Sequence, residues 1–215
     1  MSLIAEDLLL LLLDDVKGKA SVWGHTNEVL GGAVLAELAL EGLVVLEEKK
    51  SIWRAAKVRV AGTAPADLDP ILAEALATIA EKDRQPSTLV GRIGKGLDTS
   101  LAARLADRGI LERRDDKLLG LFPRTRWPAI NTLRKSEIHR AITRCLVEGA
   151  QPDPRTGEII ALLAAIGQAH TAITPGTSTS LTKRQLTKRA REIAKDHWAA
   201  AAVKDAVAAE ASAGG

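Results

Sequence analysis

The residue types that most often carry chemistry are few in this chain, and their spacing does not suit catalysis. The four histidines are His25, His139, His170 and His197. None has HExxH or another metal-ligand spacing. The single cysteine, Cys145, excludes an internal disulfide, and it lies on the apolar stripe of a predicted helix, where a thiol usually packs in the core. Residues 91–100, GRIGKGLDTS, lack the GK[ST] ending of a phosphate-binding loop, and GxSxG is absent. We therefore expect no enzymatic activity, no cofactor and no metal site.

Other features of the sequence suit binding to an anionic surface. Trp23 stands just before a helix rich in small residues, and a tryptophan beside basic groups is typical of a membrane-interface anchor. It can equally fill the core. Residues 84–144 contain 14 Lys and Arg against 6 Asp and Glu, a net charge of +8. The cations that we single out there are Arg92, Lys95, Arg104 and Arg108. This net charge indicates an anionic partner, or simply a solvated basic face.

A predicted β-hairpin combines apolar and basic residues. Its apolar residues are Leu118, Leu119, Leu121 and Phe122, and its basic rim is Arg113, Arg114, Lys117, Arg124 and Arg126. Apolar side chains ringed by cations suit an anionic membrane, where each cation adds about 1 kcal/mol. Salt and the nearby Asp115 and Asp116 lower that sum. The alternative is an ordinary hairpin that packs on the helices or forms a dimer contact.

Composition predicts that helices position these residues. Aromatic residues make up only 2% of the 215 residues, and Ala and Leu dominate, which favours helices over a β-sandwich or barrel. The first fifteen residues hold four acids and no Lys or Arg, unlike a secretory signal. The apolar run Leu8–Leu13 is far shorter than the roughly 20 residues that cross a bilayer. We expect a soluble or peripheral protein in a reducing compartment, the cytoplasm.

Hydrophobic periodicity and turn signals predict a mainly α fold. The expected helices cover 3–13, 28–41, 70–83, 99–108, 130–148, 157–170 and 181–210, and another short helix is expected to begin at 85–87. Residues 43–60 predict a pair of strands. In the second hairpin, Ile110-Leu111 and Leu118–Phe122 are expected to flank the charged turn 112–117. We expect a single domain over 1–210 and a disordered tail over 211–215.

Several segments, in order along nearly the whole chain, resemble the Golgi phosphoprotein 3 family. They are LIAEDLLLLLLDD, SVWGHTNEVLGGAVLAELALEGLVVLE, LADRGILERRDDKLLGLFPRTRWP, EIIALLAAIGQAH and KRQLTKRAREIAKDHW. The AELALEG and RGIL-to-FPRTRWP stretches are the most specific. The Ala-rich style is similar to that of bacterial members. The resemblance implies a helical bundle wrapped by amphipathic helices, with a projecting β-hairpin.

The resemblance also implies peripheral membrane binding through phosphatidylinositol 4-phosphate, a head group held by one Trp and several Arg in eukaryotic members. The hairpin of those members contributes to membrane contact and self-association. They also link Golgi membranes to trafficking machinery and hold glycosyltransferase tails. Anionic lipids, a second copy of the chain and such tails are therefore the partners that the resemblance implies.

The family's pocket residues carry over only in part. Trp23 matches the pocket Trp, whereas one expected Arg falls at Gly31 and another at Asp98. The third falls at Lys95, which keeps the charge but loses the planar guanidinium fork, and Arg92 lies near enough to substitute. We therefore expect general anionic binding rather than tight phosphoinositide selectivity.

The leading hypothesis is a peripheral membrane protein on the cytoplasmic membrane face. Trp23, Lys95 and Arg92 would meet the head group, and the apolar residues of the hairpin would enter the bilayer surface. The alternative is a soluble, self-associating scaffold that uses the hairpin, with its basic segment on acidic partners or on the chain's own acidic 1–83 region. Nucleic-acid binding is disfavoured because no stacking aromatic residues are interleaved with the cations.

Overall fold

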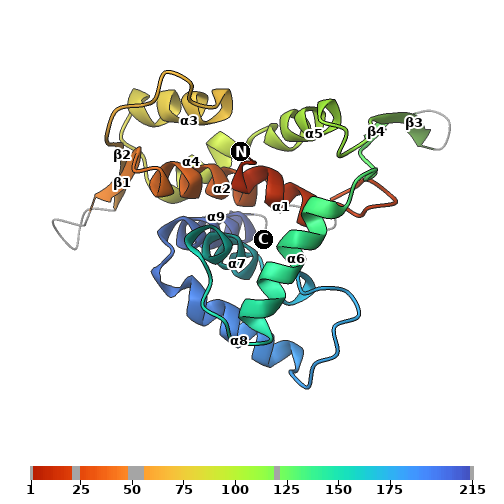
Figure 1. The fold of residues 1–215 in the computed structure, drawn as a ribbon. Coiled ribbons are helices and arrows are strands. Elements are labelled where there is room, and N and C mark those ends of the chain that lie inside the picture. Colours follow the sequence, from red (N-terminus) through yellow and green to blue (C-terminus); the bar gives the residue numbers. More distant parts are fainter. Residues whose placement is uncertain (1, 21–24, 48–55, 119–121, 214–215) are drawn as a thin grey trace.

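Helices dominate the computed structural model, which describes residues 2–20, 25–47, 56–118 and 122–213. The mainly α fold with a hairpin is confirmed (Figure 1). The helices are α1 (Ile4–Leu12), α2 (Thr26–Leu40), α3 (Pro70–Glu81), α4 (Pro86–Gly94), α5 (Leu97–Asp107), α6 (Leu133–Leu146), α7 (Pro154–Ala165), α8 (Lys183–Ile193) and α9 (Trp198–Ala213), with 3-10 turns η1 (Ala169–Thr171) and η2 (Ala194–Asp196). The strands form two antiparallel pairs, β1 (Val44–Glu47) with β2 (Lys57–Val60), and β3 (Arg114–Leu118) with β4 (Phe122–Arg126).

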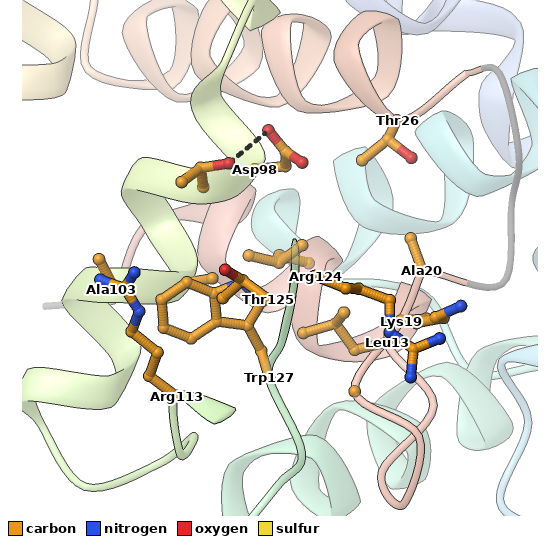
Figure 2. Close-up of a pocket in the computed structure, with 14 residues that line it drawn as sticks. Leu13, Lys19, Ala20, Thr26, Asp98, Ala103, Arg113, Arg124, Thr125 and Trp127 are labelled. Carbon is orange, nitrogen blue, oxygen red and sulfur yellow. Dashed lines mark hydrogen bonds between the residues drawn. The ribbon is translucent and has the colours of Figure 1, made fainter. Parts of the chain in front are cut away.

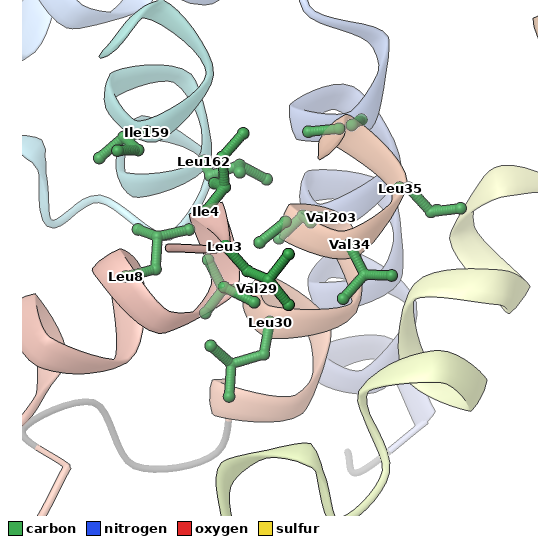
Figure 3. Close-up of a cluster of buried hydrophobic side chains, with 14 of the residues drawn as sticks. Leu3, Ile4, Leu8, Val29, Leu30, Val34, Leu35, Ile159, Leu162 and Val203 are labelled. Carbon is green, nitrogen blue, oxygen red and sulfur yellow. The ribbon is translucent and has the colours of Figure 1, made fainter. Parts of the chain in front are cut away.

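Helix α2 is the centre of the core. It packs against α1, α4, α7 and α9, and every residue from Glu28 to Leu38 is buried. Figure 3 shows Val29, Leu30 and Val34 of α2 among apolar side chains from α1, α7 and α9. Burial of its apolar side chains against the surrounding helices therefore stabilises α2 in the core.

Glycines allow two neighbours of α2 to approach its backbone. A Cβ on Gly31 would lie 1.9 Å from the Val90 carbonyl oxygen of α4, and one on Gly94 would lie 1.8 Å from the Asn27 carbonyl oxygen. A Cβ on Gly32 would lie 2.3 Å from Cγ2 of Val203 in α9. The close approach at the small residues of α2 is thus made by helices. Position 31 has no room for a side chain, so an arginine cannot stand there in this packing.

The basic segment meets the chain's own acidic N-terminal region. The Glu6 carboxylate is fully buried, and its Oε1 lies 2.9 Å from Nε of Arg104 and 2.6 Å from Nη2 of Arg108. Asp7, equally buried, accepts hydrogen bonds from Arg134 at 2.6 and 2.9 Å. Paired charges of this kind are costly to break, because removal of one partner leaves a buried charge uncompensated. Part of the +8 charge is therefore used inside the fold, as the alternative hypothesis expected.

The register of the second hairpin differs from the prediction. Residues 114–117, expected in the turn, form most of β3, and Leu118 pairs with Phe122 at the far end of the ladder. Asp116 stands opposite Arg124 and accepts two hydrogen bonds from it, both 3.0 Å. Such cross-strand pairs of opposite charge stabilise a strand pairing. The charges in 112–117 look like turn residues in the sequence, but they form a cross-strand ion-pair ladder.

The C-terminal helix, predicted as one element over 181–210, is divided. Helix α8 ends at Ile193, η2 follows, and extended His197 separates it from α9. His197 Nδ1 lies 3.0 Å from Glu158 Oε1 of α7, so a tertiary contact fixes the break. Helix α9 reaches Ala213, three residues into the segment predicted as a tail, because alanine continues a helix readily. Cys145 is buried, as its place on an apolar stripe predicts.

Candidate functional site

A hollow of ≈ 580 Å³ lies at the base of the β3–β4 hairpin, and we call it the hairpin-base pocket (Figure 2). Its walls come from the end of α1, residues 18–20, the start of α2, the helix α5 and the hairpin. The lining residues are Leu9, Leu13, Gly18, Lys19, Ala20, Thr26, Asp98, Thr99, Ala102, Ala103, Arg113, Arg124, Thr125 and Trp127. The lining combines apolar helix residues with charged side chains.

Backbone hydrogen bonds fix the two walls to each other. The Trp127 N–H donates to the Gly18 carbonyl at 2.9 Å, and the Ala129 N–H donates to the Asp15 carbonyl at 2.9 Å. Gly18 has φ +60°, and a Cβ there would lie 2.3 Å from Pro128 N, so only glycine allows this approach. The loop after α1 and the segment after β4 are therefore held together, which sets the positions of Lys19 and Trp127.

Three cations and one carboxylate are among the described residues that line the pocket. Lys19 forms no ion pair with a carboxylate among the residues that the structure describes. Arg113 lies over the Trp127 ring, with Cζ 5.9 Å from the centroid, and its Nε is 3.1 Å from Asp115 Oδ2. Asp98 is half-buried in the opposite wall and accepts a long hydrogen bond, 3.4 Å, from the Thr99 hydroxyl. The pocket lining is therefore net positive, which suits an anion.

Ion pairs within the hairpin reduce the charge of its predicted basic rim. Asp116 pairs with Arg124 and also with Arg126, whose Nη2 lies 2.6 Å from Asp116 Oδ2. The Arg124 guanidinium, by its hydrogen bonds, lowers the pKa of Asp116, which stays ionised. Arg114 Nη2 lies 2.7 Å from Glu112 Oε2. The rim thus presents less free charge than its five cations would suggest.

The structure describes two of the three residues that the sequence predicted as one head-group site, Arg92 and Lys95. Trp23 lies outside the described residues, although Ala20 and Thr26, on either side of it in sequence, both line the hairpin-base pocket. Arg92 and Lys95 line a different and smaller hollow of ≈ 140 Å³ next to α3. Arg92 Nη2 lies 3.6 Å from Glu81 Oε2.

The predicted apolar tip is only partly described. Leu118 and Phe122 end the two strands and pair by backbone. Leu119 and Leu121 lie outside the described residues, and so do the side chains of Lys117, Leu118 and Phe122. Their membrane role stays a prediction.

Sequence reasoning did not single out two residues of the pocket, Lys19 and Trp127. Trp127 is part of the FPRTRWP stretch, which is specific to the family as a whole motif but does not indicate a role for this side chain. Lys19 sits in the short loop KGKA, where nothing in the sequence signals that it meets the hairpin. Long-range backbone contacts bring both to the pocket, and these cannot be inferred from local spacing.

The family model for Golgi phosphoprotein 3 (GPP34) matches residues 4–209. The chain belongs to the Golgi phosphoprotein 3 family. No curated protein matches it. Membership of the GPP34 family suggests lipid binding in general and a non-enzymatic role. Among the described residues, no helix has the length and apolar character needed to cross a membrane.

Proposed function

We propose that this GPP34 family member is a peripheral membrane protein that binds anionic lipid head groups at the hairpin-base pocket. One observation carries the proposal: Lys19, Arg113 and Arg124 line the same hollow as the Trp127 indole, at the base of a hairpin with an apolar tip sequence. Cations beside an amphipathic ring suit the interface of an anionic membrane. The β3–β4 hairpin and the loop after α1, which both contribute residues to the pocket, lie at the same end of the molecule (Figure 1).

Each pocket residue has a distinct role in this proposal. Lys19 supplies a compact charge that can approach a phosphate from the α1 side. Arg113 and Arg124 offer the guanidinium N–H groups beyond those that bond Asp115 and Asp116, and phosphate oxygens accept hydrogen bonds from such groups. The Trp127 ring supports Arg113 and presents an indole at head-group depth.

Only the family resemblance supports selectivity for phosphatidylinositol 4-phosphate. Asp98 lines the pocket where the resemblance places an arginine, and its negative charge opposes a polyanionic head group. Trp23 stays a predicted head-group contact. Arg92 and Lys95 stay predicted contacts too, and they line a separate hollow. We therefore propose binding that depends mainly on charge, on the cytoplasmic face of a membrane.

Vesicle flotation tests the proposal. The purified chain is mixed with vesicles of phosphatidylcholine alone, with 20–30% phosphatidylserine, or with about 5% phosphatidylinositol 4-phosphate, at low and at high salt. Binding should rise with anionic lipid and fall as salt screens the cations. Equal binding to neutral and anionic vesicles, or binding to neither, contradicts it.

Self-association through the hairpin is a second candidate, favoured by the ion pairs that reduce the charge of the rim. Deletion of residues 114–126 separates the two functions when lipid flotation and sedimentation velocity are measured together. A smaller oligomer with unchanged lipid binding supports self-association. Loss of lipid binding at an unchanged oligomer size supports the membrane role.

A further inference from the structure

Three potential metal ligands meet where α2 begins and α9 ends. His25 precedes α2, Glu28 lies in its first turn, and Glu210 comes from the last turns of α9. One ligand atom from each residue lies within 4.8 Å of the other two. His25 Nδ1 and Glu210 Oε2 are 3.8 Å apart. His25, the residue before α2, and Glu28 in the first turn of α2 therefore both lie beside Glu210 of α9.

Two of these residues have a buried polar atom with no hydrogen-bond partner in the part of the chain that the structure describes. Glu28 is only 5% exposed, and its Oε2 accepts no hydrogen bond. His25 Nδ1 is likewise buried without a partner. A buried polar atom with no partner costs about 1–3 kcal/mol, so such atoms call for an explanation.

We propose that His25, Glu28 and Glu210 bind a divalent transition-metal ion of the Zn²⁺ class. An imidazole nitrogen with two carboxylate oxygens is a donor set that Zn²⁺ accepts, whereas Ca²⁺ and Mg²⁺ prefer oxygen ligands alone. The ion would supply the positive charge and the bonds that the buried oxygen and nitrogen lack.

Coordination requires the ligand atoms, which lie within 4.8 Å of one another, to move closer together. Tetrahedral Zn²⁺ with bonds near 2.0–2.1 Å places its ligand atoms about 3.3 Å apart, so the 3.8 Å between His25 and Glu210 must shrink by about half an ångström. The Glu210 side chain is 51% exposed and can make that adjustment. Three protein ligands leave a fourth position for water.

The site lies next to the candidate head-group pocket but does not depend on it. Thr26 follows His25 directly and lines the hairpin-base pocket. An ion that joins α2 to α9 would fix the start of α2, and with it one wall of the pocket. The metal proposal stands or fails on its own measurement, whatever the result of vesicle flotation.

Calorimetric titration of the purified chain with Zn²⁺, in a buffer that does not chelate it, tests the proposal. The expected result is one Zn²⁺ per chain, with affinity reduced at least tenfold in Glu210→Gln and in His25→Gln. Glu192→Gln, an exposed carboxylate on α8, is the matched control and should bind as the wild type does. Co²⁺ in place of Zn²⁺ adds a spectroscopic test, because a His and carboxylate site gives visible bands that Glu210→Gln should change.

Glu28→Gln completes the series, with circular dichroism to confirm that each variant is folded. If Glu28→Gln does not fold, Glu210→Gln still decides, since its side chain is half exposed. Absence of stoichiometric Zn²⁺ binding overturns the proposal, and so does equal affinity in the wild type and Glu210→Gln. Equally tight binding of Mg²⁺ or Ca²⁺ overturns the assigned class of metal.

Discussion

The guanidinium of Arg113 lies over the indole ring of Trp127, with Cζ 5.9 Å from the ring centroid. Trp127 itself is fixed by its backbone hydrogen bond to Gly18. The Arg113 side chain is therefore partly ordered by Trp127 before any anion binds. Binding of an anion to Arg113 would then cost less side-chain conformational entropy. Cation–π contacts of this kind contribute about 0.5–1 kcal/mol at exposed sites.

Lys19→Ala should weaken binding to anionic vesicles. Lys19 lines the pocket without an ion-pair partner among the described residues, so its full charge is available to the lipid. Loss of one cation near an anionic surface costs about 1 kcal/mol, which is about fivefold in affinity. Flotation over a lipid titration measures the change. Lys17→Ala, an exposed neighbour that does not line the pocket, is the matched control; an equal loss in both variants would show that the pocket is not the site.

Gly31→Ala should destabilise the fold. A Cβ at position 31 would lie 1.9 Å from the Val90 carbonyl oxygen, so the backbones of α2 and α4 must separate. Overpacking of this kind costs about 3 kcal/mol, and the melting temperature falls by roughly 6–12 °C for a chain of this size. Thermal unfolding followed by circular dichroism gives the value.

Gly91→Ala is the control within the same helix pair. A Cβ at Gly91 meets only Glu28 Oε1, at an ordinary 3.7 Å, so alanine should stabilise α4 by about 0.5–1 kcal/mol. A wild-type melting temperature in Gly31→Ala would mean that α2 and α4 are not in backbone contact.

The pair His197–Glu158 should make stability depend on pH. The Glu158 carboxylate, 3.0 Å from Nδ1, raises the pKa of His197 above its ordinary value of 6.5. A histidine with a raised folded pKa contributes stability below its unfolded pKa, and that contribution is lost as pH rises through the folded value. The free energy of unfolding in urea, measured from pH 5.5 to 8.5, should therefore fall more steeply in the wild type than in His197→Gln. Identical slopes would contradict the pairing.

Local signals in the sequence account for much of the fold. Asp69 before Pro70 marks the start of α3, and the Asp69 carboxylate indeed accepts a hydrogen bond from the Ile71 N–H at 3.0 Å. The small residues of α2 signal close helix packing, which Gly31 and Gly32 provide. These features depend on residues within a few positions of one another, so local pattern is enough to predict them.

The candidate sites depend on contacts that local pattern does not contain. Lys19 and Arg124 line the same pocket because backbone hydrogen bonds join the loop after α1 to the segment after β4. Histidine spacing predicted no metal site, since Glu210 completes the cluster from the far end of the chain. The hairpin register was wrong for a similar reason: the pairing of Asp116 with Arg124 outweighs the turn-like character of the charged run.

The charge at position 98 tests the pocket most directly. Asp98→Arg replaces a carboxylate of the pocket lining with a cation, a gain of two charges that should strengthen binding to anionic vesicles by about 1–2 kcal/mol, or five- to thirtyfold. Asp107→Arg makes the same change of net charge at the exposed end of α5, outside the pocket. Vesicle affinity measured for the two variants should rise strongly in Asp98→Arg and only slightly in Asp107→Arg. Equal gains, or no gain at position 98, would contradict head-group binding at the hairpin-base pocket.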